Sequence, residues 1–187
     1  MAGFLFALLA TVIAGVGARD QMLVAELAHR HGGKQGRRPA VLLTALAAAL
    51  ASAAVAGWAG AALAPLLAPH ARGLLVAMAV ALAALELLFI RPRRRLEEPT
   101  ASLGAFAIVI LAQQVTDAAR LLVFAIAANS ALPRTAIAGG MLGCAGTVAA
   151  GWLAGPELVR LPLVAVRRRL GLVLATVAVW LALSSIR

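Results

Sequence analysis

Two short polar stretches interrupt apolar segments and contain residue types that could bind a cation or carry a proton. The first is GVGARDQ, residues 15–21, and the second is QQVTDAAR, residues 113–120. Ionisable side chains are costly inside a bilayer, so they usually face a cavity or a partner. Carboxylate and amide oxygens are hard ligands suited to Ca²⁺, Mn²⁺ or Mg²⁺, and a membrane carboxylate can also carry a proton. Together the two stretches indicate cation/proton exchange.

The spacing in the second stretch predicts that its polar side chains lie near one face of a helix. Gln113 and Gln114 precede Asp117 by four and three residues, and Arg120 follows it by three. We expect Asp117 to be the primary ligand or proton carrier and Asp20 to be the second carboxylate. The expected metal-site residues are Asp20, Gln21, Gln113, Gln114, Thr116 and Asp117, with Arg19 and Arg120 compensating charge or gating.

A structural interpretation of the same residues stays open. The two stretches hold two aspartates and two arginines, so their net charge is zero. Asp20 could pair with Arg120, and Asp117 with Arg19 or Arg120. Such pairs would join helices without moving any ion. A third acid, Glu86, lies near the end of an apolar segment, and we expect it to be interfacial, snorkelling or pairing with the basic loop that follows.

The elements that must position these residues are membrane helices. The chain has 187 residues, 63% of them hydrophobic, against about half in a soluble domain. A crossing needs roughly 20 apolar residues, and the long runs lack the alternation of barrel strands. The N-terminal run has no basic residue before Arg19, so we interpret it as a span and not as a signal peptide. The six predicted spans are 3–28, 39–64, 72–90, 102–129, 133–155 and 169–186.

The basic residues predict the orientation. Twelve of the 17 Lys and Arg residues fall in loops 1–2, 3–4 and 5–6, and three fall on the other side. By the positive-inside rule these three loops are cytoplasmic and both termini are non-cytoplasmic. A net charge of +10 with this distribution is topogenic, so nucleic acid is not an expected partner. The loop residues are Arg30, Lys34, Arg37 and Arg38; Arg91, Arg93, Arg94 and Arg95; and Arg160, Arg167, Arg168 and Arg169.

The two halves of the chain resemble each other. Pro39 and Pro133 begin similar runs, and Gly57-Trp58 and Gly151-Trp152 share the same offset of 94 residues. Three spans in each half would make the halves enter the membrane in opposite senses, as in transporters whose site lies between inverted repeats. We therefore expect an all-α integral membrane protein with six transmembrane helices in an inverted 3+3 repeat. Its parts would be a first three-helix repeat (1–91), a charged cytoplasmic linker (92–101) and a second repeat (102–187).

On these features the chain resembles the Gdt-type cation/proton antiporters, which include Golgi Mn²⁺/Ca²⁺ transporters and bacterial manganese exporters. That family repeats the motif Glu-x-Gly-Asp-Lys/Arg-Thr/Ser, and its cation site uses the acids of both copies. Here Gly15 and Gln114 take the two glutamate positions, and Ala18 takes one aspartate position. Asp117 keeps the other aspartate, and Asp20 offers a substitute carboxylate. The chain is thus identified as a divergent member with degenerate motifs.

The resemblance implies a divalent-cation (Mn²⁺ or Ca²⁺)/proton antiporter in a bacterial inner membrane, with its site between the first and fourth spans. Its partners would be the lipid bilayer, the cation and the proton. Loss of both glutamates leaves an alternative, a substrate-switched or transport-inactive paralogue that acts as a membrane interaction or scaffold protein. It could assemble as a homo-oligomer or with an intact paralogue. No catalytic set, cofactor site or phosphate loop appears at suitable spacing, so we do not expect an enzyme.

Overall fold

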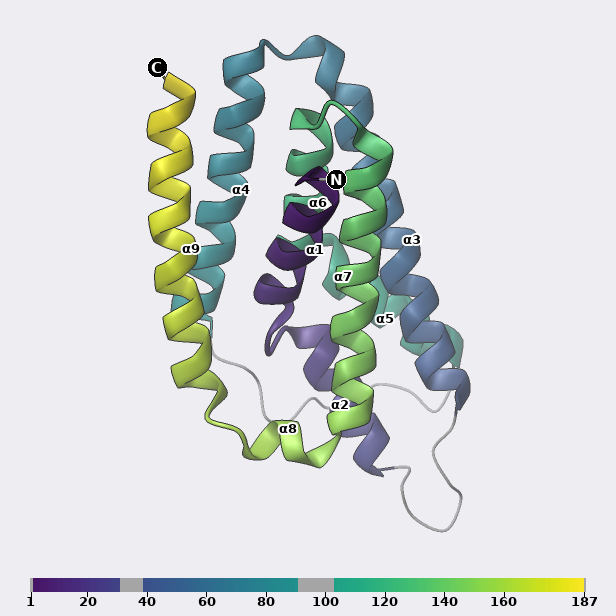
Figure 1. Ribbon diagram of the computed structural model, residues 1–187. Helices are drawn as coiled ribbons and strands as arrows, with labels where there is room; N and C mark the ends of the chain where they lie inside the picture. Colours follow the sequence, from purple (N-terminus) through teal and green to yellow (C-terminus); the bar gives the residue numbers. More distant parts are fainter. Residues whose placement is uncertain (1, 31–38, 91–102, 187) are drawn as a thin grey trace.

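The computed structural model describes residues 2–30, 39–90 and 103–186, and all regular structure in these ranges is helical (Figure 1). The elements are α1 (Ala2–Gly15), α2 (Arg19–Arg30), α3 (Pro39–Leu63), the short 3₁₀ helix η1 (Ala64–Leu66), α4 (Pro69–Phe89), α5 (Leu103–Val115), α6 (Ala118–Asn129), α7 (Pro133–Ala154), α8 (Pro156–Arg160) and α9 (Leu163–Ile186).

The described part of the chain is all-α, and the lengths and composition of its helices are consistent with a membrane protein. Four are long and apolar enough to cross a bilayer, namely α3 with η1, α4, α7 and α9. Two bent pairs raise the number to six if each pair is one span. The predicted spans 39–64, 72–90 and 133–155 match α3, α4 and α7 to within a few residues. The last helix starts at Leu163, six residues before its predicted start.

The first and fourth predicted spans are not continuous helices. The chain bends by 65° between α1 and α2 and by 58° between α5 and α6. In the first break Gly17 has φ +67°, a conformation that glycine adopts without steric cost. In the second, Asp117 is extended (φ −84°, ψ 133°) and its side chain accepts a hydrogen bond from the Ala119 amide at 3.4 Å. A glycine turn therefore separates α1 from α2, and Asp117, as the N-cap of α6, separates α6 from α5.

Small residues bring the spans close together. Helix α1 packs against α7, α3 against α6 and α7, and α4 lies along α9 (Figure 1). A Cβ at Gly139 of α7 would lie 2.2 Å from the Phe4 carbonyl oxygen of α1. A Cβ at Gly60 of α3 would lie 2.0 Å from the Phe124 carbonyl oxygen of α6. Membrane helices commonly use such small residues for close backbone approach, and here they hold the broken pairs in the middle of the bundle.

The N-terminal turns of α9 correct one assignment. Arg167, Arg168 and Arg169 were expected in a cytoplasmic loop, but all three belong to this helix. Arg167 is only 2% exposed, so its interpretation as a loop residue is wrong. The interior accommodates it because backbone carbonyls of two other segments accept its hydrogen bonds, as described below.

Candidate functional site

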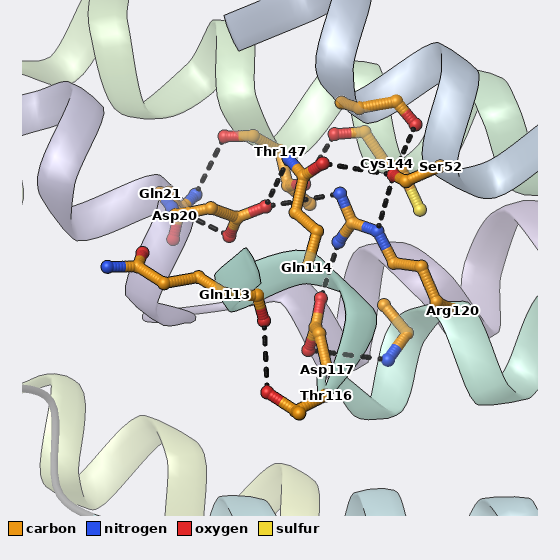
Figure 2. A network of polar contacts seen from close by, with 12 residues as sticks. Asp20, Gln21, Ser52, Gln113, Gln114, Thr116, Asp117, Arg120, Cys144 and Thr147 are labelled. Carbon is orange, nitrogen blue, oxygen red and sulfur yellow. Dashed lines mark hydrogen bonds and ion pairs between the residues drawn. The ribbon is translucent and has the colours of Figure 1, made fainter. Parts of the chain in front are cut away.

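The two helix breaks meet inside the bundle, where Arg120 joins both aspartates (Figure 2). Its Nη2 donates to Asp20 Oδ2 at 3.2 Å, and its Nη1 donates to Asp117 Oδ2. Its Nε donates to Ser52 Oγ of α3 at 3.2 Å. Arg120 and Asp20 are 5% and 4% exposed, so the network is shielded from water. One guanidinium therefore ties together α2, α3 and the start of α6.

The side-chain amide of Gln114 contacts the same network and is fully buried. With one orientation its Nε2 donates to Asp20 Oδ2 at 3.3 Å, and its Oε1 accepts from Ser52. Turned by half a rotation, it donates to Ser52 Oγ and the Ala48 carbonyl, and it accepts from Arg120 Nη2 at 3.0 Å. We favour the second orientation, because the first sets two donors, Gln114 and Arg120, against each other. In that orientation the Gln114 amide oxygen lies beside Asp20 Oδ2.

Gln21 closes the first break. Its Oε1 accepts from the Gly17 amide at 2.7 Å, and its Nε2 donates to the Thr147 carbonyl at 3.2 Å. Its own amide donates to Asp20 Oδ1 at 2.8 Å. Gln21 therefore fixes the backbone turn and the carboxylate of its neighbour, and in this conformation its amide oxygen is already occupied.

A cavity of about 290 Å³ lies beside the network and is lined by both aspartates but not by Arg120. It is lined by polar groups from α2, α4, α5 and the second break, together with Ile90 after α4. The lining residues are Arg19, Asp20, Glu86, Ile90, Gln113, Thr116 and Asp117. Gln113 Oε1 is buried and has no hydrogen-bond partner in the described part of the chain. The cavity thus joins three carboxylates with a neutral oxygen that is free to bind a ligand.

Glu86 is a member of this site that the sequence interpretation placed elsewhere. Its Oε2 accepts from the Ala118 amide at 3.2 Å, at the first residue of α6. It is therefore oriented toward the second break, and the expectation that it snorkels or pairs with the following basic loop did not anticipate this contact. The only sequence signal was an acid within a long apolar helix, which by itself gives no partner.

Arg167 is a second residue whose role the sequence did not reveal. Its Nη1 donates to the Val16 carbonyl at 2.6 Å, and its Nη2 donates to the Glu86 carbonyl at 3.2 Å. Val16 lies one residue beyond α1, so Arg167 satisfies a carbonyl that the first break leaves open. Nothing distinguished Arg167 from the two arginines that follow it in the sequence.

The eight predicted site residues are brought to one region, but not on one helical face. Arg19, Asp20, Gln113, Thr116 and Asp117 line the cavity, whereas the others lie behind the aspartates or in the first break. The expectation that Gln113, Gln114 and Asp117 share a face of a continuous helix is wrong, because α5 ends at Val115. Figure 2 shows the Gln113 side chain extending away from Arg120.

The geometry is not that of a preformed metal centre. Across residues 2–30, 39–90 and 103–186, no three His, Cys, Asp or Glu side chains come together in a way that could hold a metal ion. Arg120 occupies an oxygen of each aspartate, and hydrogen-bonded ion pairs of this kind compete with cation binding. A cation bound through Asp20 Oδ2 or Asp117 Oδ2 would have to displace Arg120 from that oxygen.

Comparison with known proteins adds no relative, since no family model, curated protein or solved structure matches the chain. The class of protein rests on the fold and the site. The described part of the chain is all-helical, with four to six candidate membrane spans, and its two bent helix pairs place buried charges beside a polar cavity.

Proposed function

We propose that this chain is a membrane transporter that exchanges a divalent cation, Mn²⁺ or Ca²⁺, for protons at the cavity between α2, α4 and the second break. One observation carries the proposal: two separate helix breaks bring Asp20 and Asp117 to the same cavity. Broken helices at the middle of a bundle are a recurrent way to build ion sites in transporters. Glu86 adds a third carboxylate from a third helix.

The packing supports an inverted 3+3 repeat, with halves at 1–91 and 102–187 joined by the linker 92–101. Each broken pair packs against the second span of the other half: α1 against α7, and α6 against α3. The third spans, α4 and α9, pack against each other. This exchange of partners is what two halves related by a twofold axis in the membrane plane would produce.

The charges suggest how exchange would work. Asp20, Asp117 and Glu86 face the cavity with Arg19, and Arg120 contacts both aspartates from behind. With all five ionised the net charge is −1. An entering cation would draw an aspartate oxygen from Arg120, which keeps its bond to Ser52. Protons and the cation compete for the same oxygens, so occupancy by one excludes the other.

The test is flux in liposomes loaded with a Mn²⁺-sensitive dye and a pH dye. Wild-type protein should carry Mn²⁺ against a counterflow of protons. Asp117→Asn should abolish both signals, because it removes the charge while asparagine still caps α6. The matched control is Glu157→Gln, the same change at an exposed acid paired with Arg160. Equal flux in wild-type and Asp117→Asn liposomes would refute the assignment of the site.

A second candidate is a membrane interaction protein that transports nothing. The specific observation in its favour is that Arg120 already neutralises both aspartates in a buried network. It predicts folded protein with no Mn²⁺ or Ca²⁺ flux under a proton gradient. It also predicts that a partner, an intact paralogue or a second copy, co-purifies with the chain.

The proposed orientation places both termini outside the cytoplasm of a bacterial inner membrane. Helix α8 and the first turns of α9, which contain the exposed Arg160, Arg168 and Arg169, lie at the end of the bundle opposite the C-terminal end of α9 (Figure 1). A reporter that fluoresces only in the cytoplasm should be dark when fused after Arg187. Fluorescence from that fusion would reverse the orientation.

A further inference from the structure

A second, smaller cavity lies between the end of α4 and the beginning of α9. Its volume is about 160 Å³. It combines two guanidinium groups with apolar walls. Of its lining residues, Ile90 alone also lines the cavity that contains Asp20, Glu86 and Asp117. Besides Ile90, the lining consists of Arg167, Arg168, Leu87, Leu88, Phe89 and Val164.

Arg167 is the deeply buried part of this cavity and is not fully satisfied. Its two Nη groups donate to carbonyl oxygens, but its Nε is buried and has no acceptor within the described residues. No carboxylate in the described ranges lies within ion-pair distance of it. The Glu86 and Asp117 carboxylates act on Arg167 electrostatically, but from beyond ion-pair distance. A buried charge without a counter-ion in direct contact is costly, and the unmade hydrogen bond of Nε adds to this cost. An anion placed directly against Arg167 would therefore be stabilised.

Arg168 adds a second positive charge on the exposed side. It follows Arg167 directly in the first turns of α9, and it is solvent-exposed where Arg167 is not. The positive end of the α9 helix dipole lies one turn away. Arginine binds phosphate oxygens in a two-pronged geometry that lysine does not reproduce. An occupant with a phosphate group fits both arginines.

The surroundings of the cavity favour a phosphate that is attached to a lipid. Phe89 and Val164, on its rim, are 75% and 39% exposed, and Leu172 further along α9 is 61% exposed. These side chains belong to two helices that are apolar and long enough to cross a membrane. Basic pockets between membrane helices at the cytoplasmic side are typical headgroup sites.

We propose that this cavity binds a phosphate group, supplied by the headgroup of an anionic phospholipid such as phosphatidylglycerol. Arg167 and Arg168 hold the phosphate, and the acyl chains lie along α4 and α9. Because Arg167 also holds the Val16 carbonyl at the first break, an occupied site stabilises the end of α1. The proposal does not depend on transport, and its test measures binding.

The experiment uses full-length protein in phosphatidylcholine nanodiscs, with retained lipid measured by native mass spectrometry during titration with phosphatidylglycerol. Arg168→Gln should weaken phosphatidylglycerol binding about tenfold, the effect of losing one charge-assisted hydrogen bond. Arg169→Gln makes the same charge change one residue away, outside the cavity lining, and should bind like wild type. Arg168 is preferred to Arg167 because its exposed side chain can be replaced without unfolding the bundle.

Three outcomes are informative. Selective loss in Arg168→Gln supports the proposal, and equal binding by the two variants overturns it. Thermal stabilisation by inorganic phosphate alone, without a preference for phosphatidylglycerol over phosphatidylcholine, would overturn the lipid source and leave a soluble phosphate as the ligand.

Discussion

Replacing Arg120 by glutamine tests whether the buried network holds the two halves of the bundle together. Arg120→Gln leaves Asp20 and Asp117 facing each other without their shared cation, although both are less than 10% exposed. Removing one partner of a buried ion pair costs about 3–5 kcal/mol. For a chain of this size, 1 kcal/mol corresponds to roughly 2–4 °C in Tm. The melting temperature should therefore fall by about 6 °C or more.

The assay is thermal unfolding in detergent, followed by size-exclusion chromatography of the heated samples. The matched control is Arg160→Gln, which breaks an ion pair whose partners are 75% and 68% exposed. Pairs that exposed contribute little to stability. A loss for Arg120→Gln no larger than that of the control would refute the interpretation of Arg120 as the centre of the network.

A compensating change separates charge from packing. In wild type the summed charge at positions 20, 117 and 120 is −1; it becomes −2 in Arg120→Gln, and adding Asp20→Asn restores −1. We expect the double variant to recover much of the lost Tm, since the uncompensated carboxylate is the costly part. If it recovers nothing, the loss comes from the missing guanidinium contacts. Mn²⁺ should also stabilise Arg120→Gln more than wild type, because a ligand that binds the folded state raises its stability.

Three further predictions concern packing and access. Gly139→Ala should lower the Tm in a melting assay, because the added Cβ would lie 2.2 Å from the Phe4 carbonyl oxygen. Gly146→Ala in the same helix is the control: its Cβ would meet nothing within 4 Å, so the variant should be neutral or stabilising. Gly17→Ala should cost about 1–2 kcal/mol in chemical unfolding, because φ +67° is unfavourable for a residue with a Cβ. Cys144 is 1% exposed, so maleimide labelling should be slow in folded protein and fast after denaturation; rapid labelling of folded protein would show that the bundle opens beside the network.

The helical architecture was predictable from hydropathy because the length of an apolar run is a local property. The starts of α3 and α7 at Pro39 and Pro133 follow from proline's place in the first helical turn. The bends were not predicted, since both polar stretches were taken as parts of continuous spans. For the second bend, a signal was present: an aspartate followed by helix-forming residues is an N-cap pattern. For the first, Gly17 makes the turn with φ +67°, but a glycine inside an apolar run does not by itself predict a break.

The candidate site was only partly predictable because its contacts are distant in sequence. Asp20 and Arg120 are separated by 100 residues, and their pairing was one of several open possibilities. The roles of Glu86 and Arg167 depend on backbone groups that the breaks expose. A sequence does not show those groups until the breaks are known. The residue types therefore predicted which segments contain the site, whereas the hydrogen-bond partners of each side chain could be identified only from the three-dimensional packing.

The carboxylates that line the cavity also accept hydrogen bonds from the broken backbone, so under the proposed function ion binding would be linked to movement of the helix. The start of α6 has two amides satisfied by carboxylates, Ala118 by Glu86 and Ala119 by Asp117. A cation that takes oxygens from both acids would weaken these bonds at the positive end of the helix. An amide that loses its carboxylate acceptor needs another partner, so a cation that displaced these bonds would favour a different position of the start of α6. The carboxylates that cap the break are thus the groups through which occupancy can change the conformation of the helix.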